Sequence, residues 1–227
     1  IRYYKVEPSL ATLVYPGIDF SRFTLLPSRS VARQRLRLSE DELCLLYVGF
    51  STPRKGVEYL AQALKVMHVP ASLLMVGKWE AGYQEKFLSI LGDASSRVKI
   101  IGYVSDSDLL DYFAAADAFV LPTLLEGFGI PLVEAMATGL PVVTTTGGSA
   151  GEIVGDAGLI VQAGESIELA EALDRVLSDR DLACQMRTLG LERARNLFDE
   201  RRTITELEAV FERRSEEHTS ELQSPNT

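Results

Sequence analysis

Hydrophobic residues along the chain follow two patterns that replace one another repeatedly. Largely apolar runs of strand length predict strands, and those at 42–50 and 141–146 are expected to be buried. The runs cover residues 42–50, 71–77, 97–104, 117–123, 141–146 and 157–164. Between them, apolar residues recur at helical spacing, as Val57, Leu60 and Leu64 do after the first run. The expected helices cover residues 28–38, 51–67, 80–94, 105–116, 132–138, 165–179, 180–198 and 199–214.

Strands that alternate with helices of this length indicate an α/β fold, a doubly wound parallel sheet of Rossmann-like type. The continuous apolar runs agree with this, since parallel strands are covered on both faces. Ligands bind such sheets at the carboxyl ends of the strands. The loops that we expect at this edge begin at Gly49, Gly77, Gly102 and Pro122.

Composition narrows the class of protein. The 227 residues are 46% hydrophobic and 24% charged, which is enough for one domain with its own core. The net charge of -9, without a basic tract, argues against nucleic acid as a partner. Cys44 and Cys184 lie far apart and are predicted to be reduced thiols of a cytoplasmic protein. His68 and His218 have no partners at ligand spacing, so we predict no metal site.

The stretch 125–143 carries the densest group of candidate functional residues. Glu126 and Glu134 flank a segment in which Gly127 and Gly129 allow a close approach of the backbone to a ligand. Pro131 is expected at the first position of a helix, and the following Gly-Leu-Pro sequence is expected to end it. A helix N-terminus behind a glycine-rich loop predicts an anion site. The alternative is that Glu134 is a helix-dipole acid and Glu126 a solvated carboxylate.

The same stretch resembles the donor-sugar signature of retaining glycosyltransferases of the GT-B fold, in particular glycosyltransferase family 4. That signature is similar to P-S-x-x-E-G-F-G-x-x-x-x-E-A-M-A-x-G-x-P-V. Here residues 122–129 read PTLLEGFG, 134–137 read EAMA and 139–142 read GLPV. Thr123 departs from the usual serine and keeps the hydroxyl. The resemblance implies the C-terminal half of a GT-B fold. It also implies transfer of a sugar from a nucleoside-diphosphate sugar to a hydroxyl acceptor with retention.

The loop GFSTPRKG at 49–56 is neither a dinucleotide fingerprint nor a P-loop, which argues against a nicotinamide dehydrogenase and an NTPase. In the resembling family this loop often reads G-R-x-x-x-x-K-G, or P-R-K-N in one branch, and its cations hold the diphosphate. Lys55 matches the family lysine, whereas Phe50 stands where many members have arginine. We expect Arg54 to take that role. The alternative is a solvated helix start, at which cations are unfavourable.

The resemblance also implies the remaining roles. Glu134 would hold the ribose hydroxyls and Glu126 would face the transferred sugar, since carboxylates accept charge-assisted hydrogen bonds from hydroxyls. Tyr103 and Val104 would cradle the nucleobase; the alternative for Tyr103 is a half-buried aromatic. The other residues expected to bind the donor are Gly49, Gly77, Gly127, Phe128, Gly129 and Ile130.

The implied enzyme is a retaining hexosyltransferase that needs no cofactor or metal, because Lys55 and Arg54 supply the cations. The donor is expected to be GDP-mannose or a UDP-sugar, and the PRK loop favours a mannosyl donor. One alternative is a nucleotide-sugar epimerase of the same fold. Another is a non-catalytic nucleotide-sugar-binding module, although such a module would not need Glu126, Glu134 and Lys55 together.

Three regions are expected along the chain. Residues 1–23 would be the end of a missing N-terminal domain and the inter-domain linker, since YPGIDFSRF at 15–23 resembles the family's P-x-G-V-D-x-x-x-F. Residues 24–213 would form the nucleotide-sugar-binding domain. The missing domain would bind the hydroxyl acceptor and make any peripheral membrane contact. We therefore expect the chain alone to be inactive in transfer.

The third region, 214–227, has an unusual origin. RSEEHTSELQS at 214–224 resembles the in-frame translation of a common short-read sequencing adapter. The alternative is an ordinary polar, disordered tail. We treat the region as an artefact and exclude it from functional reasoning.

Overall fold

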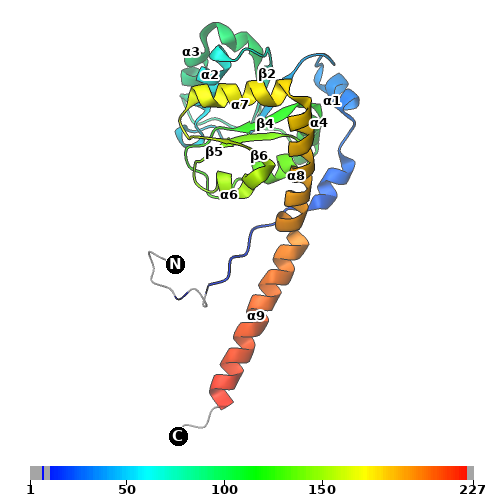
Figure 1. Cartoon of the computed structure of the whole chain (residues 1–227), viewed down its shortest axis with the longest axis vertical. Helices are drawn as coiled ribbons and strands as arrows, with labels where there is room; N and C mark the ends of the chain where they lie inside the picture. Colours follow the sequence, from blue (N-terminus) through cyan, green and yellow to red (C-terminus); the bar gives the residue numbers. More distant parts are fainter. Residues whose placement is uncertain (1–6, 8–10, 224–227) are drawn as a thin grey trace.

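A computed structural model of the chain, which describes residues 7 and 11–223, has one six-stranded parallel sheet at its centre (Figure 1). The strand order is β3-β2-β1-β4-β5-β6. The strands are β1 (Cys44–Val48), β2 (Ser72–Val76), β3 (Val98–Gly102), β4 (Ala118–Leu121), β5 (Val142–Thr145) and β6 (Gly158–Val161). Leu45 of β1 pairs with Ala118 of β4, and all four residues of β4 are buried. The predicted doubly wound, Rossmann-like fold is confirmed.

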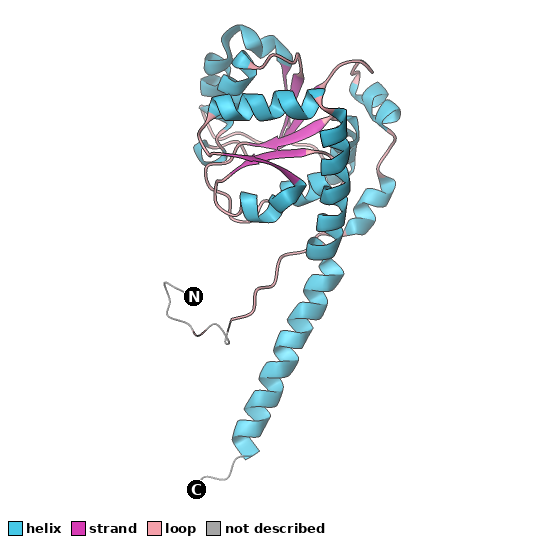
Figure 2. Ribbon diagram, viewed as in Figure 1, coloured by secondary structure: helices cyan, strands magenta, loops and turns pink. Residues whose placement is uncertain are grey.

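Helices cover the sheet on both sides, with α7 on one side and α6 on the other as labelled in Figure 1; Figure 2 shows the same view coloured by secondary structure. The α-helices are α1 (Arg29–Leu36), α2 (Val57–Val66), α3 (Tyr83–Leu91), α4 (Asp106–Ala115), α5 (Ile130–Ala137), α6 (Ala150–Val154), α7 (Ser166–Ser178), α8 (Arg180–Phe198) and α9 (Glu200–Gln223). The 3-10 helices are η2 (Phe20–Leu25), η3 (Pro53–Lys55), η4 (Gly92–Arg97) and η5 (Gly155–Ala157). α2 packs against α3 and α7, α1 against α4, and α5 against α6 and α8.

The order of the strands sets the position of the site. From β1 the chain moves outward to β2 and β3, returns to β4 beside β1, and moves outward again to β5 and β6. The two halves therefore diverge between β1 and β4. The loops that leave the carboxyl ends of these two strands meet at this switch point, where open α/β sheets bind ligands.

Most element boundaries agree with the hydrophobic pattern, and the exceptions have local causes. Ser105 caps α4 as predicted, because its side chain accepts a hydrogen bond from the Asp108 amide. The sequence did not predict α6, which has only five residues and so gives no helical period. It also missed η2, in the segment expected to have no element of its own.

The last helix is longer than the expected 199–214 segment. α9 runs to Gln223 and extends away from the sheet (Figures 1 and 2). Its final turns therefore fall in the adapter-like region, whose last four residues, 224–227, lie outside the described part of the chain. The artefact interpretation stays a prediction.

A completely buried arginine ties α1 to the sheet. Arg33 donates from Nε to the Ala115 carbonyl at 3.0 Å and from Nη1 to the Glu42 carbonyl at 2.7 Å. Its Nη2 pairs with Asp117 at 2.9 Å, and Asp117 also accepts from the Cys44 amide. A buried cation is tolerated when its donors are satisfied in this way. The sequence predicted a short basic helix here and did not predict that one of its cations is buried.

Two further observations concern the chain as a whole. Cys44 is buried and Cys184 exposed, and both are free thiols. Burial raises the pKa of Cys44 to about 11, so this thiol stays protonated at neutral pH. None of the helices in the described part of the chain combines the length and the apolar composition that a membrane span requires.

We predict that Arg33→Met lowers the free energy of unfolding by about 3 kcal/mol or more, because it leaves buried carbonyls and Asp117 without this partner. Arg35→Met is the matched control, since Arg35 pairs with Asp111 at the surface and such pairs contribute about 0–1 kcal/mol. Denaturant unfolding of both variants makes the measurement. Equal losses of stability would contradict the role assigned to Arg33.

Candidate functional site

The loop after β1 and the loop after β4 lie against each other at the switch point. The Arg54 carbonyl accepts hydrogen bonds from the Leu124 amide at 2.9 Å and from the Thr123 hydroxyl at 3.3 Å. Thr123, the residue that departs from the signature's serine, thus uses its hydroxyl to join the two loops. These contacts bring together two loops that we name after their expected ligands: the phosphate loop, residues 49–56, and the sugar loop, residues 122–129.

A buried ion pair joins Lys55 and Glu126 across these two loops. The Lys55 ammonium donates to Glu126 Oε2, and the two residues are only 9% and 8% exposed. Glu126 Oε1 accepts from the Gly127 amide at 3.1 Å. Two charges so far from water are stable only because each compensates the other. The sequence selected both residues for the site and did not predict that they touch.

Arg54 lies next to this pair in a more open position. Its side chain is half exposed, and Nη1 donates to the Leu125 carbonyl at 2.8 Å. The same nitrogen is 3.9 Å from Glu126 Oε1. The guanidinium therefore stands at the rim of the site with donors that remain accessible. Phe50, at the place of the family arginine, is exposed.

The sugar loop leads into α5 through a left-handed glycine. Gly129 has φ +92° and is the N-cap of α5, and no side chain caps this end. In this first turn Pro131 has no amide hydrogen and the Leu132 amide donates to the Gly129 carbonyl at 2.9 Å. The helix start therefore offers an anion chiefly the positive end of its dipole. Helix α5 begins at Ile130, so Pro131 occupies its second position; the prediction that it stands first was wrong by one residue.

A segment that the sequence prediction overlooked holds this loop from the other side. The Glu126 amide donates to the Gly147 carbonyl at 3.2 Å, and the Ser149 amide donates to the Glu126 carbonyl at 3.1 Å. Gly148 has φ +68°, and a Cβ there would lie 2.3 Å from the Glu126 carbonyl oxygen. The double glycine directly after a buried strand was the signal that could have identified this contact.

Glu134 lies one turn further along α5 and is buried beside an arginine from η2. The Arg22 Nη1 donates to Glu134 Oε1 at 3.3 Å, and Arg22 Nη2 is 3.5 Å from Asp106 Oδ2. Burial raises the pKa of Glu134, while the Arg22 guanidinium opposes that shift and Asp106 adds to it. Neither Arg22 nor Asp106 was among the predicted site residues.

A hollow of about 360 Å³ opens beside these groups at the carboxyl ends of β1, β2 and β3. Its lining combines the strand-end glycines with the loop after β3. The lining residues are Val48, Gly49, Phe50, Val76, Gly77, Lys78, Tyr103, Val104, Asp106 and Leu109. Tyr103 is 73% exposed, with the Lys78 ammonium 5.4 Å from its ring centre, so it is not the half-buried aromatic of the alternative interpretation. The predicted residues Gly49, Gly77, Tyr103 and Val104 thus share one surface.

The Phe128 side chain connects the sugar loop to the ends of the domain. Its ring centre is 6.3 Å from that of Tyr15 and 5.8 Å from that of Phe198, the last residue of α8. The sequence prediction concerned only the Phe128 amide. Through its ring, the sugar loop also contacts the segment before η2 and the point where α8 gives way to α9.

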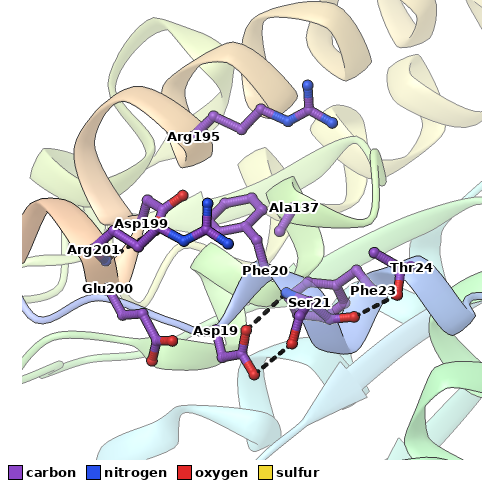
Figure 3. A pocket seen from close by; sticks show the side chains of 10 residues that line it. All are labelled: Asp19, Phe20, Ser21, Phe23, Thr24, Ala137, Arg195, Asp199, Glu200 and Arg201. Carbon is purple, nitrogen blue, oxygen red and sulfur yellow. Dashed lines mark hydrogen bonds between the residues drawn. The ribbon is translucent and has the colours of Figure 1, made fainter.

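Two other hollows lie away from the predicted residues. One, of about 470 Å³, is lined by η2 and by the junction of α8 and α9, where Arg195 and Arg201 stand near Phe20 (Figure 3). Asp19 there accepts hydrogen bonds from the amide and hydroxyl of Ser21. The other, of about 920 Å³, lies at the amino ends of the strands near Asp117 and Pro141. Neither contains any of the residues that the sequence selected.

We predict that Gly148→Ala destabilises the sugar loop. An alanine at φ +68° costs about 1–2 kcal/mol, and its Cβ would also collide with the Glu126 carbonyl. Gly127→Ala is the matched control in the same loop, because no atom lies within 4 Å of the added Cβ; it should change stability by less than about 1 kcal/mol. Equal melting temperatures for the two variants would contradict this account of Gly148.

Known proteins share this chain's sequence pattern. The O-antigen chain mannosyltransferase B of Escherichia coli is 32% identical over 180 residues, covering 66% of this chain and 47% of that protein. The D-inositol 3-phosphate glycosyltransferase of Geodermatophilus obscurus is 30% identical over 232 residues, covering 96% of this chain and 50% of that protein. The chain therefore spans about half the length of the curated relatives that it matches.

The fold has counterparts among solved structures. HepE of Anabaena, in a structure with UDP and glucose, superposes with a TM-score of 0.81 at 25% identity, covering 93% of this chain and 59% of that one. In sequence, residues 28–193 match the family described as Glycosyl transferases group 1. That match extends from the start of α1 into α8 and includes every predicted site residue. The chain belongs to the glycosyl transferases group 1 family.

Proposed function

We propose that this chain is the donor-binding half of a retaining glycosyltransferase and that its carboxyl-edge site holds a nucleoside-diphosphate sugar. The observation that carries the proposal is the buried Lys55–Glu126 pair beside the uncapped start of α5. A cation, the positive end of a helix dipole and a carboxylate at one point suit a diphosphate linked to a sugar. HepE, a structural counterpart, was solved with UDP and glucose.

The diphosphate is proposed to compete with Glu126 for Lys55. Among the described residues, Glu126 is the carboxylate partner of the Lys55 ammonium. A diphosphate placed there would bring more negative charge to Lys55 and would also accept from the amides of Phe128 and Gly129. The accessible Arg54 guanidinium is proposed to replace the family arginine that is absent at Phe50.

The two glutamates are proposed to recognise hydroxyl groups. Glu126, once Lys55 turns to the phosphates, accepts from the sugar that is transferred. Glu134, which Arg22 links to Asp106 on the wall of the hollow, accepts from the ribose. The nucleobase would then lie in the hollow against Tyr103 and Val104, between the strand-end residues Gly49 and Gly77.

The proposed reaction breaks the bond between the anomeric carbon and the diphosphate oxygen, and the electron pair leaves with the diphosphate. The acceptor hydroxyl oxygen bonds to the same face of that carbon, and its proton passes to the departing diphosphate oxygen, so the anomeric configuration is retained. Lys55, Arg54 and the α5 amides act by stabilising the charge on the departing diphosphate. In this proposal they supply that stabilisation without a metal or another cofactor.

The donor and the acceptor are proposed at the level of class. GDP-mannose or a UDP-sugar is the donor; a relative named as a mannosyltransferase favours the former and the UDP-bound counterpart the latter. Since the relatives are about twice as long, we assign residues 1–23 to the end of an N-terminal domain and the inter-domain linker, and 24–213 to the donor domain. We propose that a further domain binds the hydroxyl acceptor and makes any contact with a membrane. The proposed location of the protein is the cytoplasm.

Three substitutions separate the proposed roles. Lys55→Met should weaken binding of UDP or GDP and make it less sensitive to salt, because a cation on the diphosphate is lost. Glu134→Gln should weaken both the nucleoside diphosphate and the sugar nucleotide by up to about 10–150-fold, the equivalent of a charge-assisted hydrogen bond of 1.5–3 kcal/mol. Glu126→Gln should weaken binding of the sugar nucleotide and leave UDP or GDP bound at least as tightly, because it removes the carboxylate that competes for Lys55. Calorimetry with UDP, UDP-glucose, GDP and GDP-mannose makes the comparison.

The double variant Lys55→Met/Glu126→Gln controls for stability, because it removes both members of the buried pair and leaves no isolated charge. It should unfold at a higher denaturant concentration than Lys55→Met alone. It should bind the nucleoside diphosphate as weakly as Lys55→Met does. Unchanged affinities in both Glu126→Gln and Glu134→Gln would mean that the two acids are a solvated carboxylate and a helix-dipole acid, as in the alternative interpretation.

We also predict that the chain alone binds a nucleoside diphosphate and leaves sugar nucleotides unchanged, since the proposed acceptor site lies on another domain. Incubation with UDP-glucose or GDP-mannose, followed by chromatography, should show neither free nucleoside diphosphate nor an epimeric sugar nucleotide. Accumulation of an epimer would support the epimerase alternative. Rapid release of nucleoside diphosphate would show that these residues suffice for the chemistry.

A further inference from the structure

Arg22 joins two carboxylates that belong to different helices of the site. It lies in η2, 112 residues before Glu134 in the sequence, and its Nη1 donates to Glu134 Oε1 at 3.3 Å. Its Nη2 is 3.5 Å from Oδ2 of Asp106, the first residue of α4 and part of the wall of the hollow. One guanidinium thus spans the distance from α5 to the hollow.

The two carboxylates differ in how much they need this cation. The Asp106 side chain is 80% exposed, so water solvates it, whereas that of Glu134 is 9% exposed. A buried carboxylate without a partner takes up a proton instead of remaining charged. The charged groups that face Glu134 are Arg22, from η2, and Asp106, from α4, and they act in opposite directions on its pKa. The ionised form of Glu134 therefore depends on Arg22.

We propose that Arg22 is a positioning residue of the nucleoside subsite, which holds the Glu134 carboxylate charged and aimed at the ribose. This inference rests on the proposed donor function of the site. It assigns to Arg22 no contact with the ligand; Arg22 acts through Glu134. An arginine suits this task because its planar fork reaches two carboxylates at once, and lysine offers only a point charge.

The proposal has a definite pH dependence. A glutamate accepts charge-assisted hydrogen bonds from hydroxyls only when it is ionised, and these are stronger than those to the neutral acid. Donor affinity is therefore highest above the pKa of Glu134 and weakens as pH falls through it. Removal of Arg22 takes away the group that lowers this pKa. The pKa rises, and affinity is lost at a higher pH than in the unaltered chain.

The test is a double-mutant cycle on the whole chain between pH 5 and pH 8. UDP-glucose and GDP-mannose are the probes, because the diphosphate of a sugar nucleotide lacks the terminal phosphate that titrates near neutral pH in UDP and GDP. The variants are Arg22→Leu, Arg22→Lys, Glu134→Gln and Arg22→Leu/Glu134→Gln. Arg35→Leu, which removes an exposed arginine paired with Asp111, is the matched control.

Arg22→Leu should weaken binding of the probe several-fold at the acidic end of this range and by less at pH 8, because loss of the cation raises the pKa of Glu134. Arg22→Lys should restore part of the affinity, since it keeps a positive charge beside Glu134 and lacks the fork that reaches both carboxylates. In the Glu134→Gln background, loss of Arg22 should change affinity by less than about twofold at every pH. Arg35→Leu should bind as the unaltered chain does.

Other results would overturn the inference. An Arg22→Leu effect of equal size with and without Glu134 would show that Arg22 contacts the ligand directly, and tighter binding would show that it blocks the subsite. If the unaltered chain binds the probe and Arg22→Leu shows the same dependence of affinity on pH, the inference about Arg22 is wrong. The proposed donor site would still stand. Failure of the unaltered chain to bind either probe would defeat the proposed function, and this inference with it.

Discussion

The contact between the Lys55 ammonium and the Glu126 carboxylate is the constraint on which the carboxyl edge of the sheet depends. Both charges are buried, and neither could remain there without the other. To bring them together, the loops after β1 and β4 must lie in contact, which is possible because these strands are neighbours at the switch point. Gly56 permits the contact, since a Cβ at its φ of +64° would lie 2.1 Å from the Pro122 carbonyl oxygen.

Much of the fold could be predicted from the sequence because the signal is local. Each strand of the sheet is an apolar run, and the loops between strands contain enough residues for one helix. The exceptions lack such a signal. α6 is too short to show a period, and Arg33 looks like one more cation of a basic helix. Arg33 is buried because the Ala115 carbonyl and Asp117 surround its guanidinium. These groups are more than 80 positions away in the sequence, so the local pattern gives no sign of them.

In the candidate site, the residues could be predicted from the sequence, whereas the contacts between them could not. The residues with a sequence motif, such as Lys55, Glu126 and Gly129, could be selected in advance because the motif marks loop, helix start and strand together. Their contacts could not. Lys55 and Glu126 are 71 positions apart, and Arg22 and Glu134 are 112 apart, so only the topology brings them together. The resemblance to the family signature identified which residues belong to the site. The structure shows which of their charges compensate one another.

The central claim is that a diphosphate takes Lys55 from Glu126. The most direct measurement is a crystal structure of the chain grown with a sugar nucleotide, UDP-glucose or GDP-mannose. We expect the diphosphate within hydrogen-bonding distance of Lys55 Nζ and the Gly129 amide, with the Lys55–Glu126 contact opened and the sugar beside Glu126. A ligand bound at the amino ends of the strands, in the hollow near Asp117 and Pro141, with the Lys55–Glu126 pair intact, would contradict the account.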